Sequence, residues 1–122
     1  MYYQAPHQPF FACVGGYCLP SKQRYQEFAL GEGLIGQCAK NQQLMRIHNV
    51  PDDYLITESG TLTIKTQELR LIPIVFPNER VAAVLELAFV TKMTAQGELL
   101  VDDIVSRIAM QLKILERQGT TA

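Results

Sequence analysis

Apolar positions along the chain follow two different periods, and these periods predict its strands and helices. The stretches 69–76 (LRLIPIVF) and 81–90 (VAAVLELAFV) are rich in branched apolar residues, and we expect both to be strands. The segment Pro77–Arg80 between them contains a proline and an asparagine, which favour a tight turn. The pattern therefore predicts a β-hairpin at the centre of a sheet.

A period of three to four residues marks two helices. Between Glu98 and Gln118 the apolar residues recur at that spacing, which predicts a long helix with one apolar face. A shorter stretch, Leu30–Lys40, predicts a short helix with Asn41 as its C-cap. Residues 119–122 are expected to be a frayed tail, so the folded domain should cover residues 1–118.

Three shorter apolar stretches predict further strands. Met1–Ala5 and Phe10–Leu19 are separated by a turn that contains prolines, and Leu44–Val50 ends at Pro51. The charged segment Ser21–Glu27 is expected to connect the second strand to the short helix.

The middle of the chain is polar and is expected to be irregular. Asp52 is placed to cap a turn of helix, and Thr57–Gln67 is rich in threonine. We expect that second segment to be a loop with at most one helical turn. Because most neighbouring elements are joined by short connections, the sheet should be mainly antiparallel, with about five or six strands in an α+β domain.

Composition restricts the partners and the compartment. With 122 residues and a net charge of −1, the chain suits one domain and carries no strong field, so we expect neither nucleic acid nor membrane contact. Its cysteines, Cys13, Cys18 and Cys38, include no CxxC pair and are odd in number. Free thiols are typical of a reducing compartment, which predicts a cytoplasmic protein. The sequence shows no signal peptide, and no apolar run reaches the about 18 residues that span a bilayer.

The glycine-spaced segment Leu30–Gly36 (LGEGLIG) is the most distinctive motif. A phosphate-binding loop of this spacing normally follows a strand and opens a long helix. Here a charged connection precedes the glycines and the predicted helix is short. We therefore interpret Gly31 and Gly33 as a tight turn and Gly36 as a point of close helix–sheet packing.

Several short motifs, taken in order, make the chain resemble a GAF domain, most of all the GAF modules of bacterial two-component sensors. The resemblance covers Phe28 to Leu115. Its motifs are Gly31, Gly33 and Gly36, then Val50-Pro51, then Ile72-Pro73-Ile74, then Ala83-Val84-Leu85-Glu86-Leu87. The sequence departs from the family in two ways: it begins in the first strand without the preceding helix, and Ala83 stands where the family has glycine.

The resemblance implies a fold and a function. The fold is a GAF/PAS-like central antiparallel sheet flanked by helices, with the N-terminal helix missing. The function is that of a non-catalytic sensory domain in a larger signalling protein, which binds a small molecule and passes the change through its C-terminal helix. Implied partners are an unidentified small molecule, a second copy of the chain and an output domain such as a histidine kinase.

We expect a ligand to bind between the polar loop and the central hairpin. The candidate residues are Tyr54, Ile56, Thr57, Ser59, Thr61, Leu62, Ile72, Ile74 and Glu86. The expected dimer seam on the C-terminal helix is Val105, Ile108, Leu112 and Leu115. Glu86 is unusual within an apolar strand, and an exposed sheet edge or a pair with Arg70 would also account for it.

Two other functions remain open. One is a GAF module without a ligand that serves dimerisation or scaffolding. The other is a cysteine-dependent methionine sulfoxide reductase, which would use cysteines after the short strand, where this chain has none beyond Cys38. Cys38 and His48 have no partners at metal-binding spacing, and the motif of cyclic-nucleotide-binding GAF domains is absent, so no catalytic residue, metal site or cofactor is assigned.

Overall fold

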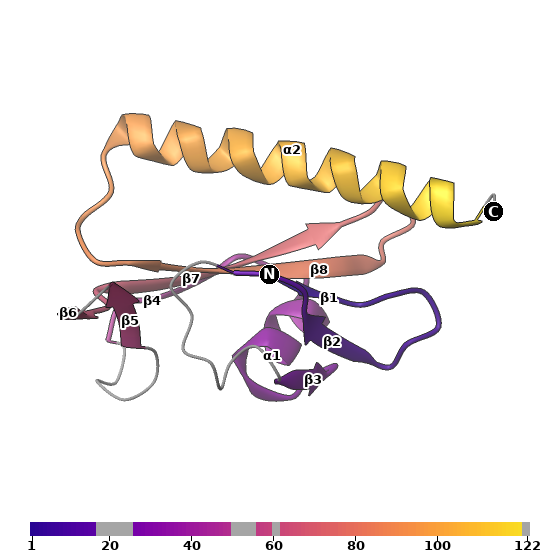
Figure 1. Ribbon diagram of the computed structural model, residues 1–122, viewed down its shortest axis with the longest axis horizontal. Coiled ribbons are helices and arrows are strands. Elements are labelled where there is room, and N and C mark those ends of the chain that lie inside the picture. The colour runs from indigo at the N-terminus through magenta and orange to yellow at the C-terminus, as the bar shows by residue number, and fades with distance from the viewer. Residues whose placement is uncertain (17–25, 50–55, 60–61, 121–122) are drawn as a thin grey trace.

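A six-stranded antiparallel sheet, in the order β3-β2-β1-β8-β7-β4, organises the molecule in the computed structural model. The structure describes residues 1–16, 26–49, 56–59 and 62–120. Helix α2 lies across one face of the sheet and helix α1 lies on the other (Figure 1). The predicted fold class, an α+β arrangement consistent with a GAF/PAS-like fold, is confirmed.

The predicted central hairpin is formed by β7 (Glu68–Val75) and β8 (Val81–Phe89). Their register runs from Glu68 opposite Phe89 to Ile74 opposite Ala83, with one irregularity after Ile74. In the turn, the side-chain oxygen of Asn78 accepts a hydrogen bond from the backbone N–H of Arg80 at 3.1 Å. This local bond is the usual way in which asparagine stabilises a turn.

Four short strands complete the sheet: β1 (Tyr2–Tyr3), β2 (Phe10–Cys13), β3 (Glu27–Ala29) and β4 (Met45–Ile47). Strand β1 joins β2 to β8, while β3 and β4 form the two edges. Strand β3 was not predicted, because its few residues have no pattern of their own and are ordered by pairing with β2. The end of the predicted strand Phe10–Leu19 lies outside the described residues.

Helix α1 (Gly33–Asn41) follows the glycine turn as predicted. Gly31 and Gly33 have positive φ angles of 85° and 61°, which glycine adopts without strain. A Cβ atom at Gly36 would lie 2.2 Å from the carbonyl oxygen of Ala29, so this position requires glycine for the close approach of helix and sheet. The predicted cap Asn41 is still helical, and the left-handed C-cap is Gln42, at φ 55°.

The predicted polar loop is instead a second hairpin. Strands β5 (Ile56–Ser59) and β6 (Leu62–Lys65) pair with each other and form a separate two-stranded sheet at one end of the molecule (Figure 1). The loop prediction was wrong because it weighted the polarity of threonine above its β-branched shape, which favours strands. The predicted capping turn at Asp52 lies outside the described residues.

Helix α2 (Ala95–Thr120) begins earlier than predicted and includes two residues of the expected tail. The hydroxyl of Thr94 accepts a hydrogen bond from the backbone N–H of Gly97 at 3.0 Å, which makes it a side-chain N-cap. Two cores lie on opposite faces of the sheet. The core beneath α1 contains Phe11, Ile35, Cys38, Leu69, Leu71 and Val84, and the core beneath α2 contains Ile74, Phe76, Ala82, Ala83 and Leu112.

Candidate functional site

The alternation of side chains along β7 sets the chemistry of the α2 face. Leu69 and Leu71 point into the core beneath α1, while Ile74 points into the core beneath α2. Because side chains alternate along a strand, Arg70 and Ile72 belong to the α2 face with Ile74. A charged residue is therefore placed under the beginning of α2, inside an otherwise apolar strand.

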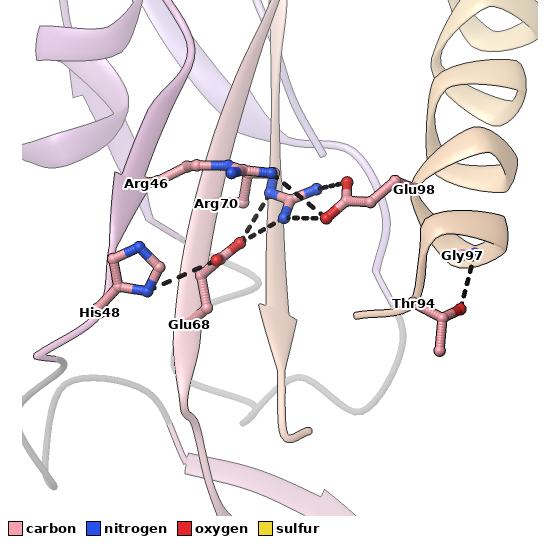
Figure 2. Close-up of polar contacts among 7 residues, drawn as sticks. All are labelled: Arg46, His48, Glu68, Arg70, Thr94, Gly97 and Glu98. Carbon is pink, nitrogen blue, oxygen red and sulfur yellow. Dashed lines mark hydrogen bonds and ion pairs between the residues drawn. The ribbon is translucent and has the colours of Figure 1, made fainter. Parts of the chain in front are cut away.

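Arg70 is only 3% exposed, and two carboxylates hold it there. Its two terminal nitrogens donate to the carboxylate oxygens of Glu98, in the first turn of α2, at 2.6 and 2.9 Å. Its Nε donates to Glu68 at 2.8 Å, and the guanidinium stacks 4.6 Å from the centre of the Phe89 ring. Figure 2 shows Arg70 between these two carboxylates, so this one side chain ties α2 to the sheet.

The electrostatics of this cluster follow from these bonds. The hydrogen bond from Arg70 is the main cause that lowers the pKa of the Glu98 carboxyl, with the charges of Arg70 and Arg46 adding to it. The bond to Glu98 likewise raises the pKa of Arg70. A buried guanidinium needs such partners, because removing either charge leaves the other desolvated and unpaired.

Edge strand β4 adds a second arginine. Arg46 lies directly opposite Arg70 in the β4–β7 pairing, and its Nη2 lies 3.3 Å from the same Glu98 carboxylate. Like charges directly opposite each other destabilise a sheet unless an anion lies between them. Glu98 supplies that anion. Close by, the ring of His48, which is mostly exposed, has Nδ1 3.6 Å from Glu68 (Figure 2).

Two grooves meet at this cluster, and Arg46 and Glu98 line both. The first, which we call the Lys92 groove, has a volume of about 450 Å³; its walls are Arg46, His48, Gln67, Glu68, Phe89, Thr91, Lys92, Met93 and Glu98. The second, the Ile72 groove, has about 620 Å³; its walls include Arg46, Arg70, Ile72, Val101, Val105 and Glu98. Volumes of this size suit small metabolites.

The predicted ligand residues of the central hairpin lie on both faces of the sheet. Ile72 lines the groove named after it, but Ile74 is buried beneath α2, and Glu86 lies opposite Leu71 on the α1 face. Tyr54 and Thr61 lie outside the described residues. Ile56, Thr57, Ser59 and Leu62 belong to the β5–β6 hairpin.

Glu86 is partly buried and is not paired with Arg70. Strand β8 lies between β1 and β7, and Arg70 points to the other face of the sheet. Burial raises the pKa of the Glu86 carboxyl, and the nearby amino group of Met1 partly offsets that effect. The pair with Arg70 suggested from the sequence is therefore wrong, because the two side chains lie on opposite faces of the sheet.

The expected dimer seam mostly contacts the protein's own sheet. Leu112 is buried, Ile108 packs against the same core, and Val105 is half-buried on the Ile72 groove. Leu115 is the exposed member, at 54%. Apolar side chains that a partner could meet on α2 are instead Leu99, Leu100, Ile104, Met110, Ile114 and Leu115.

The buried Cys38 has the character of a core residue, as predicted. Burial raises the pKa of its thiol to about 11, so very little of the nucleophilic thiolate exists at neutral pH. Within the residues that the structure describes, no three His, Cys, Asp or Glu side chains gather in a way that could hold a metal ion.

Comparison with protein-family models gives no match to this chain, and comparison with curated proteins gives none either. Across the described parts of the chain, no helix combines the length and apolar character that a bilayer crossing requires.

The main residues that sequence reasoning missed are Arg46 and Glu98. Arg70 carried a signal, since a charge inside LRLIPIVF needs a partner. The partner was assigned to Glu86 on the neighbouring strand, although Glu98 at the start of the next helix was also available. Choosing between them required the register of β7 and β8 and the path of α2.

Proposed function

We propose that this chain is a non-catalytic, GAF-like sensory domain of a larger cytoplasmic signalling protein. It binds a small molecule in the Lys92 groove and passes the change to α2. The support comes from one feature: Glu98 is at once a wall of that groove and part of the first turn of α2. A molecule in the groove therefore contacts the group that attaches the helix to the sheet.

The relay works by a shift between two populations. In one, Glu98 bonds Arg70 and the start of α2 is held on the sheet; in the other, that bond is weakened and the first turns of α2 loosen. A ligand shifts the balance only through its difference in affinity for the two states. Contact with the side chains around Glu98 provides such a difference, and the output domain attached to the protein responds to α2.

The test uses protein purified from its own host and examined by native mass spectrometry. We expect a retained small molecule, and we expect Thr91→Trp, which fills the Lys92 groove, to abolish its retention. Gln111→Trp, which adds the same bulk to an exposed position of α2, is the matched control and should retain it. A protein that carries no small molecule in either form would contradict ligand sensing.

The second candidate is a ligand-free dimerisation or scaffold module, and the exposed apolar side chains of α2 favour it. Leu100, Ile104 and Leu115 are each more than 40% exposed and lie on one side of the helix. Analytical ultracentrifugation separates the candidates: a scaffold forms a dimer that Ile104→Glu disrupts, with no retained small molecule.

A further inference from the structure

We propose that the Lys92 groove recognises a small molecule through a phosphate or carboxylate group, which binds Arg46 in competition with Glu98. This inference rests on the proposed function and adds the class of ligand. It also gives the two arginines different roles, with Arg46 as the recognition residue and Arg70 as the fixed anchor.

The first support is the unequal state of the two arginines that face each other across β4 and β7. Arg70 is buried and its guanidinium makes close contacts with both Glu68 and Glu98. The Arg46 side chain is 46% exposed, and among the described residues its ion pair is a single 3.3 Å contact with Glu98. A guanidinium has five N–H donors, so Arg46 retains donors that a ligand can use.

The second support is the charge that remains available in the groove. Its carboxylates, Glu68 and Glu98, already bind Arg70. The exposed cationic side chains Arg46 and Lys92 line the same groove. The charge in the groove that a ligand can contact is therefore positive. Anions bind such sites through charge-assisted hydrogen bonds, which are about twice as strong as neutral ones.

The third support is the shape of the groove. Phe89 and Met93 form an apolar wall beside the cationic side chains. The combination suits a ligand with one anionic group and a small apolar or planar body, rather than a free ion alone. His48, at the same groove, adds a ring nitrogen that can contact the polar part of such a molecule.

Competition with Glu98 predicts the direction in which a substitution of Glu98 changes the affinity for an anion. An anion bound to Arg46 takes over the role that Glu98 has between the two arginines, so ligand binding weakens the attachment of α2. Conversely, Glu98→Gln removes the competing carboxylate and should strengthen anion binding. A purely structural role for Glu98 predicts weaker binding or no change.

The experiment titrates inorganic phosphate, and separately succinate, into the protein at pH 7 and constant ionic strength, with backbone amide shifts as the readout. We expect saturable shifts around Arg46 and the first turn of α2. Arg46→Gln should weaken binding by roughly tenfold, since one charge-assisted contact is lost. Glu98→Gln should strengthen it several-fold. The two probes show whether phosphate or carboxylate is preferred.

Matched controls come from an exposed ion pair on the same helix, Asp103 with Arg107. Arg107→Gln and Asp103→Asn make the same charge changes away from the groove and should leave both titrations unchanged. If Glu98→Gln loses its folded spectrum, Lys92→Gln takes its place, with weaker binding expected in a variant that leaves the Arg70 cluster intact.

Three outcomes overturn the inference: no saturable binding of either anion, an equal loss in Arg107→Gln, or weaker binding in a folded Glu98→Gln variant. Its failure can be told from failure of the proposed function. A neutral molecule retained in the groove without anion binding removes this inference and keeps the sensory domain. Absence of any retained molecule removes the sensory domain itself.

Discussion

The two ends of α2 are attached to the sheet by the same pair of residue types, arginine and glutamate, in different surroundings. At the beginning of the helix, Glu98 binds Arg70 of β7. Near its end, Glu116 binds Arg80, from the turn before β8, at 2.7 Å, and also accepts a hydrogen bond from the hydroxyl of Tyr3 at 2.7 Å. Each arginine comes from the same β7–β8 hairpin.

The two attachments differ in the side chains that line the groove beside each glutamate. The exposed cations Arg46 and Lys92 line the same groove as Glu98. The groove beside Glu116 has a mainly apolar lining that includes Leu112 and Leu115, and a volume of about 600 Å³. Under the proposed function, an arginine–carboxylate pair alone does not make a switch. The proposal requires spare cations next to the pair, which provide the competition that a ligand needs.

The largest effect is expected from Arg70→Met, which keeps an unbranched flexible side chain and removes the guanidinium with its charge and donors. It removes the guanidinium that Glu68 and Glu98 share and leaves Glu98 with its single contact to Arg46, so the free energy of unfolding should fall by about 3 kcal/mol. Urea denaturation measures the change. A loss below about 1 kcal/mol would mean that the carboxylates turn to solvent and that Arg70 is not the main attachment.

Arg80→Met should have a smaller effect, about 1–2 kcal/mol, because Tyr3 still donates a hydrogen bond to Glu116. Hydrogen exchange should show the loss of protection in the last turns of α2, whereas Arg70→Met should affect the first turns. If both variants loosen the whole helix equally, the two ends do not behave as separate attachments.

Acid should act on the first attachment through Glu98. Because the pKa of this carboxyl is lowered in the folded protein, its stabilising effect is present above the ordinary glutamate value and is lost as the pH falls through the lowered value. Denaturation followed from about pH 6 to about pH 3, a range that includes the ordinary glutamate pKa, should show a component that Glu98→Gln removes. An unchanged profile in that variant would contradict the lowered pKa.

Alkali should act on the second attachment through Tyr3. Burial, followed by the hydrogen bond to Glu116, raises the pKa of the Tyr3 hydroxyl. Its stabilising effect is therefore complete below the ordinary tyrosine value of 10.0 and is lost as the pH rises through the raised value. After correction for base-catalysed intrinsic exchange, the protection of amides in the last turns of α2 should fall above that pH in the natural protein, but not in Tyr3→Phe.

The smallest effect is expected from Asp103→Asn, midway along the exposed side of α2. Asp103 and Arg107 form an ion pair at 3.0 Å, with side chains 56% and 79% exposed. Exposed ion pairs of this kind contribute less than about 0.5 kcal/mol to the free energy of unfolding. Thermal denaturation should barely change, and a larger shift would show that simple charge on α2, rather than attachment at its ends, controls stability.

Long apolar patterns made part of the fold predictable from the sequence. The β7–β8 hairpin and α2 each carry many apolar residues at one spacing, so local errors average out. Strand β3 has three residues and exists through its pairing with Phe10–Ala12 of β2. The prediction for the β5–β6 hairpin failed for a different reason. Threonine occurs in both loops and strands, and the surrounding structure decides which of the two it adopts.

The candidate site was much less predictable. Arg70 and Glu98 are 28 positions apart, and Arg46 and Glu98 are 52 apart. Their meeting depends on the side-chain parity of β7, on the position of β4 at the sheet edge, and on where α2 crosses it. No local pattern contains these three facts together, whereas the turn formed by Gly31 and Gly33 is a local property and was predicted.

Gly36 has a consequence for how sequence can vary in this protein. Any side chain there would collide with the carbonyl oxygen of Ala29 and with the backbone of Gly31, and neither can move without breaking β3 or the turn before α1. In a saturation mutagenesis library selected for folding, position 36 should therefore return glycine alone, while its exposed neighbour Gln37 accepts most residues. Because position 36 requires glycine, this glycine can serve as a reference position when distant sequences with the same architecture are aligned.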